Sequence, residues 1–126
     1  MNKLDLIKRV KKRKTAIGVT IDNIAKLTNL DNRTVSRFFD DGNVKLNTIE
    51  KITKLLGLDL AGKEIVDIEA LKKQRAREKA LYIVFLVQDT STLEKQGLNH
   101  TELEILIQET QEQFLTGKYQ KYLWVD

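Results

Sequence analysis

Apolar residues recur at helical spacing along the first half of the chain, and capping residues divide them into short segments. The first apolar stripe predicts a helix over residues 3–17, ended by Gly18, and consists of Leu4, Ile7, Val10 and Ile17. Thr20 predicts the start of a second helix over about 21–28, and Asp31 that of a third over about 32–40. Asn29 lies between these two helices, where the turn needs a residue that tolerates positive φ.

A loop and a fourth apolar stripe follow. Residues 40–43, Asp-Asp-Gly-Asn, are typical of a loop. The fourth stripe predicts a helix closed by Gly57, and it consists of Leu46, Ile49, Ile52, Leu55 and Leu56. Ala61-Gly62 then predicts a small hairpin near 58–66, with an irregular linker as the alternative.

A long helix is predicted to open the second half. Asp67 is a suitable N-cap for a helix over about 68–96, which Gly97 would end. Residues 80–87, Ala-Leu-Tyr-Ile-Val-Phe-Leu-Val, are apolar on every helical face. Their composition also suits a β-strand, but the charged residues before them favour a continuing helix.

A last helix is predicted over about 100–116. Asn99 and Glu102 resemble a capping box at its start, and Gly117 would close it. Its apolar side, which consists of Leu103, Leu106, Ile107 and Phe114, would pair with the long helix as a helical hairpin. The predicted fold class is therefore mainly all-α: a bundle of four helices, the possible small hairpin, and a C-terminal helical hairpin.

The segment over residues 20–40 has the pattern of two short helices that cross over a tight turn. Ala25 is small enough for the crossing, and Leu30, Val35 and Phe38 give the second of these helices a buried side. The opposite side is polar and consists of Asn32, Arg33, Ser36, Arg37 and Asp40. Asn, Arg and Ser side chains can contact base edges or phosphates of DNA.

These residues carry a resemblance to a known family. Residues 20–58 resemble the Cro/repressor-type (Xre-like) helix–turn–helix domains of bacteria and phages, through "IAKLTNL", "TVSRF", the Gly42 loop and "LNTIEKITKLLGL". The resemblance implies that the helix over 32–40 enters the major groove of double-stranded DNA. The predicted base contacts are Asn32, Arg33, Ser36 and Arg37, and the predicted phosphate contacts are Thr20, Thr34, Asn43 and Lys45.

Four departures from the family pattern accompany the resemblance. Ile21 stands where the family often has a Gln that contacts a phosphate, which puts that contact in doubt. The turn has Asn29 where Gly is usual, and the loop before Gly42 is one residue longer. The Pro often found before the fourth helix is absent, because the chain contains no Pro.

Charge separates the two halves of the chain. Residues 1–58 contain 13 Lys and Arg against 6 Asp and Glu, a net charge of +7, whereas residues 59–126 carry a net charge of −3. We therefore expect a DNA-binding domain over 1–58 and a helical region for dimerisation or partner binding over 59–126. The basic run over 8–14 would attract DNA through its field, or be a solvated face. A second basic cluster over 72–79 favours a solvated stem over a DNA-facing surface.

The apolar residues of the second half predict an interface. Dimers on paired half-sites are expected for a domain of this size, so we expect a homodimer. The predicted interface residues are Tyr82, Phe85, Leu86, Leu103, Leu106 and Ile107. The aromatic tail over 118–126 would either contribute to such an interface or cover the chain's own core.

The function expected from these features is a sequence-specific transcriptional regulator, most simply a repressor. Small Xre-like proteins often serve as antitoxins, so the resemblance leaves open an antitoxin whose second half masks a toxin protein. No pattern indicates a catalytic site, a cofactor site or a metal site, so an enzyme is not expected. With no Cys, no signal peptide and no long apolar run, a soluble cytoplasmic protein without a membrane segment is expected.

Overall fold

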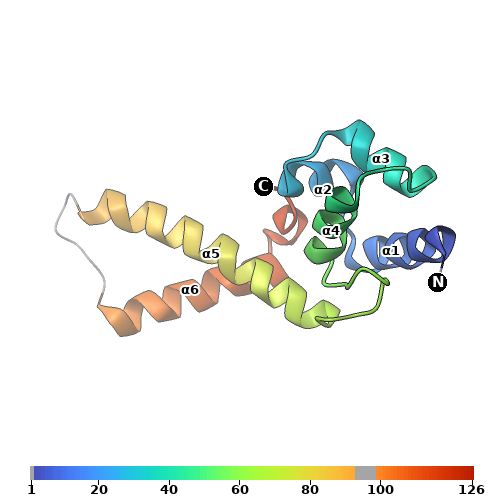
Figure 1. Cartoon of the computed structure of the whole chain (residues 1–126). Coiled ribbons are helices and arrows are strands. Elements are labelled where there is room, and N and C mark those ends of the chain that lie inside the picture. The colour runs from blue at the N-terminus through green and yellow to red at the C-terminus, as the bar shows by residue number, and fades with distance from the viewer. Residues whose placement is uncertain (1, 93–98) are drawn as a thin grey trace. The chain divides into compact units, whose positions relative to one another are not determined.

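The computed structural model describes residues 2–92 and 99–126, and within them it is mainly helical, with no strand (Figure 1). The helices are α1 (Lys3–Ile17), α2 (Ile21–Thr28), α3 (Asn32–Asp40), α4 (Leu46–Leu55), α5 (Ile68–Thr92), α6 (His100–Leu115) and the short η1 (Gln120–Tyr122). The all-α fold class is thus confirmed. The predicted end of the long helix near 96 and its closure by Gly97 lie outside the described residues.

The chain divides into two compact units. The first comprises the residues up to Leu71 together with Trp124–Asp126, and the second comprises Lys72–Leu123. The functional boundary predicted after residue 58 therefore falls inside the first unit.

The helix boundaries of the first unit follow from local capping. Thr20 accepts a hydrogen bond from the backbone N–H of Asn23 (3.0 Å), and the Asn23 side chain accepts one from the N–H of Thr20 (3.4 Å), which together form a capping box. Asp31 accepts a hydrogen bond from the N–H of Thr34 (2.7 Å) and starts α3. Gly18, with φ of 86°, ends α1 as predicted.

The core of the first unit is closely packed. Six apolar side chains from α1 to α4 and the residue after α4 are completely buried: Val10, Ile24, Val35, Phe38, Ile52 and Leu56. Two members of the predicted stripes are instead exposed, Leu4 (59%) and Leu46 (60%). Both lie in the first turn of their helices, and in α1 it is Leu6 that shares the buried side with Ile7 and Val10.

The predicted hairpin near 58–66 is reduced to one antiparallel bridge, between Leu58 and Glu64. The Asp59 carboxylate accepts hydrogen bonds from the N–H groups of Ala61 (2.8 Å) and Lys63 (2.9 Å), which tightens the turn. The N–H groups of Ile65 (2.8 Å) and Val66 (3.1 Å) both donate to the carbonyl of Gly57, so the chain turns back and no ladder continues.

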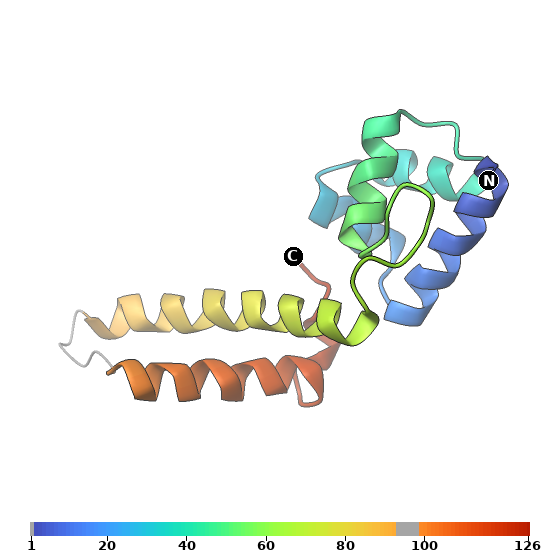
Figure 2. The ribbon, with the colours of Figure 1, turned by 60° about the horizontal axis from the view of Figure 1, so that its bottom comes forward.

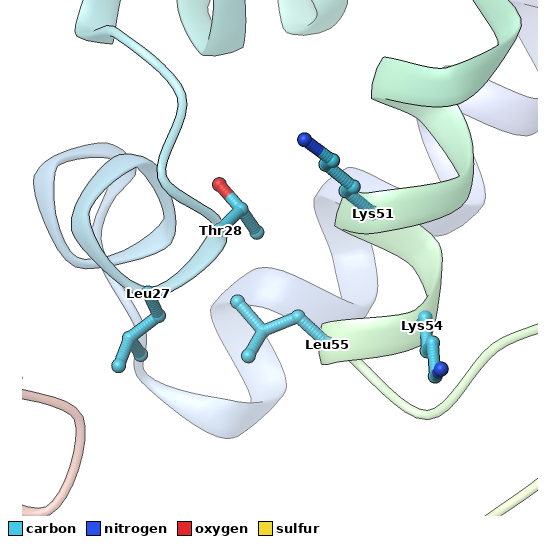
Figure 3. Close-up of a pocket in the computed structure, with 5 residues that line it drawn as sticks. All are labelled: Leu27, Thr28, Lys51, Lys54 and Leu55. Atoms are coloured by element: carbon cyan, nitrogen blue, oxygen red, sulfur yellow. The ribbon is translucent and has the colours of Figure 1, made fainter.

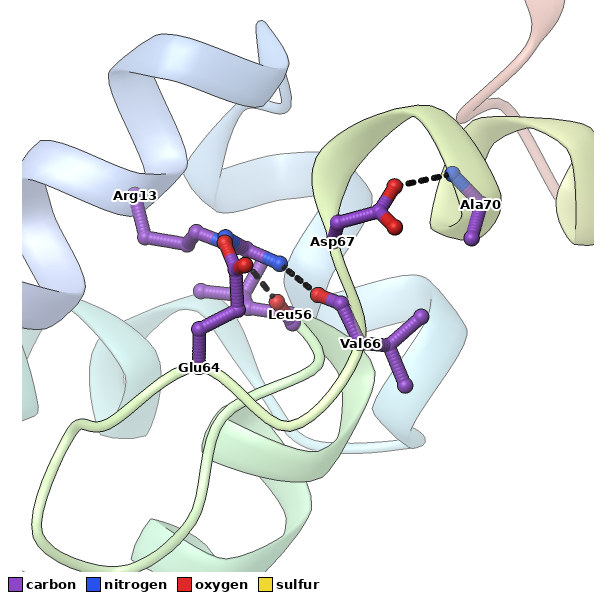
Figure 4. Close-up of polar contacts among 6 residues, drawn as sticks. All are labelled: Arg13, Leu56, Glu64, Val66, Asp67 and Ala70. Atoms are coloured by element: carbon purple, nitrogen blue, oxygen red, sulfur yellow. Dashed lines mark hydrogen bonds and ion pairs between the residues drawn. The ribbon is translucent and has the colours of Figure 1, made fainter.

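Arg13 of α1 fastens this turn (Figure 4). Its side chain is 7% exposed, and its Nε donates to the carbonyl of Leu56 (2.9 Å). The guanidinium also donates to the Glu64 carboxylate and to the Val66 carbonyl. A Cβ on Gly57 would lie 3.2 Å from both the Arg13 guanidinium and the Val66 carbonyl, and Gly57 has φ of 73°, so this position favours glycine.

The second unit is an antiparallel helical hairpin in which α5 and α6 lie side by side (Figure 2). Residues 80–87 are helical, so the strand alternative is wrong. The hairpin core contains the buried Ala80, Val84 and Ile107, and Leu81, Leu103 and Leu106 pack against it. Asn99 accepts a hydrogen bond from the N–H of Glu102 (2.8 Å) and starts α6 as predicted.

The chain beyond α6 packs on the hairpin. The rings of Phe114 and Tyr119 lie 5.3 Å apart, and Arg75 of α5 donates to the carbonyl of Leu123 (2.9 Å). Gly117 follows α6 for a different reason from the one expected, because it has no left-handed backbone conformation. A Cβ there would lie 2.9 Å from the Cα of Gln113, so close approach of the backbone favours glycine.

Candidate nucleic-acid interface

The geometry of the candidate site begins at the turn between α2 and α3. Asn29 has φ of 60° and ψ of 36°, the left-handed conformation that the sequence predicted for it. The N–H of Leu30 donates to the carbonyl of Ala25 (2.9 Å), which closes the end of α2. Ala25 is 2% exposed, as a small residue at a helix crossing should be. The turn thus directs α3 across α2 within a few residues.

The inner side of α3 is apolar and buried. Val35 and Phe38 are completely buried, as predicted, while Leu30 just before the helix is half-buried. Phe39 is also buried (5% exposed), and its ring meets that of Phe38 edge-on at 5.1 Å. The apolar spacing in the sequence did not predict the burial of Phe39. Three buried side chains fix the rotation of α3 about its axis and therefore fix its outer side.

The outer side of α3 carries the predicted base-contacting residues. Asn32, Arg33 and Arg37 are exposed, and Ser36 is half-buried between them. Asp40, at the last turn, is exposed as well. Neither arginine forms an ion pair with a described residue, so both guanidinium groups can donate to a ligand.

Asp22 of α2 is a residue of this surface that the sequence did not single out. Its carboxylate accepts a hydrogen bond from the Asn32 amide (3.2 Å) and pairs with Lys26 (3.2 Å). The hydrogen bond from Asn32, then the contact with Lys26, lower the pKa of Asp22 below its usual value. The i,i+4 spacing of Asp22 and Lys26 could have indicated the ion pair, but the contact with Asn32 depends on the helix crossing.

The predicted phosphate contacts lie close to helix starts. Thr20 is exposed and caps α2, whereas Thr34 is half-buried in the first turn of α3. Asn43 is exposed, and its N–H donates to the Asp41 carboxylate (2.8 Å). Lys45 is exposed at the start of α4, which has no side-chain cap. Helix starts favour anions because their first N–H groups have no partner within the helix.

Asp31 serves as a cap, as the sequence predicted. The hydrogen bond from the Thr34 N–H is the main cause that lowers its pKa, and the positive charges of Arg33 and Arg37 act in the same direction. Asp31 is therefore ionised at neutral pH, and its carboxylate caps the start of α3.

The basic run over residues 8–14 is divided by the fold. Lys8, Arg9, Lys11 and Lys12 are exposed and contribute to the field around the first unit. Arg9 also donates to the carbonyl of Ala61 (3.3 Å). Arg13 is neither a field residue nor a solvated one, because it is buried in the contacts of Figure 4. Its position between Val10 and Ile17 on the buried side was the available signal.

The second basic cluster is largely engaged within the hairpin. Arg75 pairs with Glu78 (3.7 Å), and Arg77 pairs with Glu104 (3.3 Å). Lys79 lies over the ring of Phe114, 5.9 Å from its centroid. The pair of Arg77 with Glu104 and the contact of Lys79 with Phe114 join α5 to α6, whereas Arg75 and Glu78 both belong to α5.

The six predicted interface residues do not share one surface. Tyr82 (70%), Phe85 (50%) and Leu86 (57%) are exposed on α5. Leu103 and Leu106 are half-buried in the hairpin, and Ile107 is 4% exposed. An interface role for Ile107 would require the hairpin to open. The aromatic tail is divided too: Leu123 and Trp124 are buried, whereas Tyr122 is exposed.

No helix among the described residues is both long enough and apolar enough to cross a membrane. Over residues 2–86 and 99–126, His, Asp and Glu side chains form no group of three or more that could hold a metal ion. Comparison of the chain with protein-family models, with curated proteins and with solved structures gives no significant match.

Proposed function

We propose that this protein is a sequence-specific DNA-binding regulator of transcription, most simply a repressor, that acts as a homodimer. One observation carries the proposal: the outer side of α3 displays Asn32, Arg33 and Arg37, while Val35 and Phe38 hold its inner side in the core. A helix whose inner side is buried and whose outer side carries exposed polar side chains suits the major groove of B-DNA.

Charge supports the same proposal. The net charge of +7 over residues 1–58 favours a polyanion, and the exposed lysines of α1 add to the field. Asp22 restrains the amide nitrogen of Asn32 and leaves the amide oxygen available as an acceptor. The two arginines are then the donors best suited to guanine, which presents two acceptors in the major groove.

The test is selection of duplexes from a random DNA pool by the full-length protein, followed by affinity measurements over a range of salt concentrations. Arg33→Ala and Arg37→Ala should each weaken binding of the selected site by about 1–3 kcal/mol and relax its specificity at one position. Lys11→Ala is the matched control, because it removes an exposed charge from α1. It should weaken selected and random DNA alike and reduce the salt slope.

Failure to enrich any sequence, or normal binding by both folded arginine variants, would overturn the proposal. Binding that does not respond to salt would also contradict it, because phosphate contacts release counterions.

A second candidate is an antitoxin that neutralises a partner toxin through its second half and represses its own promoter through its first. The exposed Tyr82 and Phe85 on one side of α5 favour it, because grouped apolar side chains mark protein contacts. Purification of the untagged protein from its native cells, followed by mass identification of what co-elutes, separates the two candidates. A stoichiometric second protein supports the antitoxin, and the chain alone supports the homodimeric regulator.

A further inference from the structure

A shallow hollow of about 300 Å³ opens between α2 and α4 in the first unit (Figure 3). Its lining consists of Leu27, Thr28, Lys51, Lys54 and Leu55. In Figure 3, Leu55 reaches from α4 toward Leu27 and Thr28, and the two lysines extend from the same helix. The proposed function uses none of these residues.

The hollow lies away from the surface proposed for DNA. Asp22 marks the flank of α2 that meets α3, because it binds Asn32, and Lys26 pairs with it on that flank. Leu27 follows Lys26, about 100° further round the helix. A partner in the hollow would therefore not compete with α3 for its ligand.

The chemistry of the hollow suits an acidic, amphipathic helix. Leu27 and Leu55 are half-buried and form an apolar floor. Lys51 and Lys54 are exposed, stand about one turn apart on α4, and pair with no carboxylate among the described residues. An open hollow does not enclose a small molecule as most ligand pockets do, but it accepts a side chain that protrudes from another helix.

The outer side of α6 has the complementary pattern. Ile105 is 50% exposed, and Glu109 and Glu112 follow it at i+4 and i+7, on the same side of the helix. Both glutamates are exposed and pair with no described cation, whereas Glu104 pairs with Arg77. One apolar side chain and two carboxylates thus lie in a single stripe.

The spacings of the two stripes match. Lys51 and Lys54 are three residues apart, as are Glu109 and Glu112, so the charges rise by the same distance along each helix. In an antiparallel pair of helices, Lys51 meets Glu112 and Lys54 meets Glu109. Ile105 then lies level with residue 58, about 4.5 Å beyond Leu55, at the C-terminal edge of the apolar floor.

We propose that α6 of one chain docks antiparallel on α4 of a second copy of this chain, with Glu109 and Glu112 paired with the two lysines and Ile105 at the edge of the hollow. Two-fold symmetry repeats the contact, so each chain gives one α6 and one α4. The proposal rests on the homodimer of the proposed function and assigns it a contact separate from the α5 surface, which consists of the exposed Tyr82, Phe85 and Leu86.

Charge reversal tests the contact by sedimentation equilibrium on the full-length chain without DNA. Lys51→Glu with Lys54→Glu, and separately Glu109→Lys with Glu112→Lys, should each raise the dimer Kd by at least about 30-fold, because four exposed ion pairs become like-charge pairs. An equimolar mixture of the two variants should restore association to near the wild-type Kd, because each α6 then meets an α4 of opposite charge.

The control is Lys11→Glu with Lys12→Glu, which reverses the same charge on α1 and should leave the dimer Kd unchanged. Circular dichroism checks that each variant is folded, as its exposed positions predict. A monomeric wild-type protein at high micromolar concentration overturns the proposal. A dimer that is insensitive to both reversals also overturns it and leaves the α5 surface as the interface.

A third contrary result concerns docking within one chain. If the mixture stays dissociated while one chain with all four reversals behaves as wild type, α6 meets α4 of its own chain and the proposal is wrong. DNA selection is measured separately, so failure of this contact differs from failure of the proposed DNA-binding function.

Discussion

The two compact units bury their apolar residues in different ways. In the first unit, large side chains such as Phe38, Ile24 and Ile52 are completely buried. Among the described side chains of α5, the completely buried ones in the second unit are those of Ala76 and Ala80. Small residues let two helices approach closely, but each removes little apolar surface from water. The first unit therefore has the larger source of hydrophobic stability.

The exposed apolar residues show the same difference. Those of the first unit lie on α1, at the start of α4, in the turn after it and in the segment Trp124–Asp126: Leu4, Leu46, Leu60, Ile65 and Val125. Those of α5 stand together at i, i+3 and i+4: Tyr82, Phe85 and Leu86. Single exposed apolar residues are ordinary, whereas a group of them indicates a contact with another molecule. The comparison supports the proposal that the first unit is stable by itself and that the second unit associates with another molecule.

The largest expected effect compares one phenylalanine from each unit. Phe38→Ala should lower the free energy of unfolding by about 3–5 kcal/mol, because a completely buried ring leaves a cavity. Phe85→Ala should cost less than about 1 kcal/mol in the monomer, because half of that side chain is already exposed. Urea unfolding below the dimer Kd measures both. Equal losses of unfolding free energy in the two variants would contradict the difference in burial between the two units.

The next effect compares the two arginine contacts. Arg13→Ala should lower the free energy of unfolding by about 3 kcal/mol, because it leaves the carbonyls of Leu56 and Val66 without their buried donor. Arg77→Ala should cost about 0.5 kcal/mol, because its pair with Glu104 is well exposed. Thermal unfolding of the two variants measures both losses of stability. An Arg13→Ala protein as stable as the Arg77→Ala protein would show that Arg13 is merely one more residue of the basic run.

A third prediction tests whether the exposed apolar residues of α5 form the dimer interface. Phe85→Asp should raise the dimer Kd by about 100-fold, because each substitution acts twice in a two-fold interface and replaces an apolar contact by a charge. Leu4→Asp is the matched control, since Leu4 is similarly exposed but stands alone on α1. Analytical ultracentrifugation measures both. Equal effects of the two variants would contradict the assignment of an interface to α5.

The sequence predicted most helix boundaries because their signals are local. The caps Thr20, Asp31 and Asn99 each bind a backbone N–H three residues later, so a short stretch of sequence contains the whole interaction. The helical period likewise predicted the buried Val35 and Phe38 and the exposed stripe opposite them.

What the sequence missed depends on contacts between distant segments. Arg13 was grouped with its basic neighbours, although its burial follows from carbonyls of residues after α4. The contact of Asp22 with Asn32 exists only because α2 and α3 cross. Ile107 was predicted to lie in an interface but is buried within its own hairpin. An apolar stripe predicts burial, but it does not indicate whether the same chain or another chain covers it.

The smallest expected effect concerns pH and the turn of the first unit. The N–H of Lys63, and then that of Ala61, lower the pKa of Asp59 below the usual 3.8. Since the folded-state pKa is below the unfolded one, the stabilisation from Asp59 is complete above about pH 4 and is lost as pH falls through the folded-state value.

Asp59→Asn keeps a hydrogen-bond acceptor but loses the charge. The variant should therefore be slightly less stable than wild type at pH 7, and the difference should vanish toward about pH 2. Urea midpoints measured from pH 7 down to about pH 2 test this, with Asp59→Glu as a control that keeps the charge but moves it from the turn. A difference that stays constant over the whole range would show that the ionised carboxylate does not hold the turn that Arg13 fastens to α1.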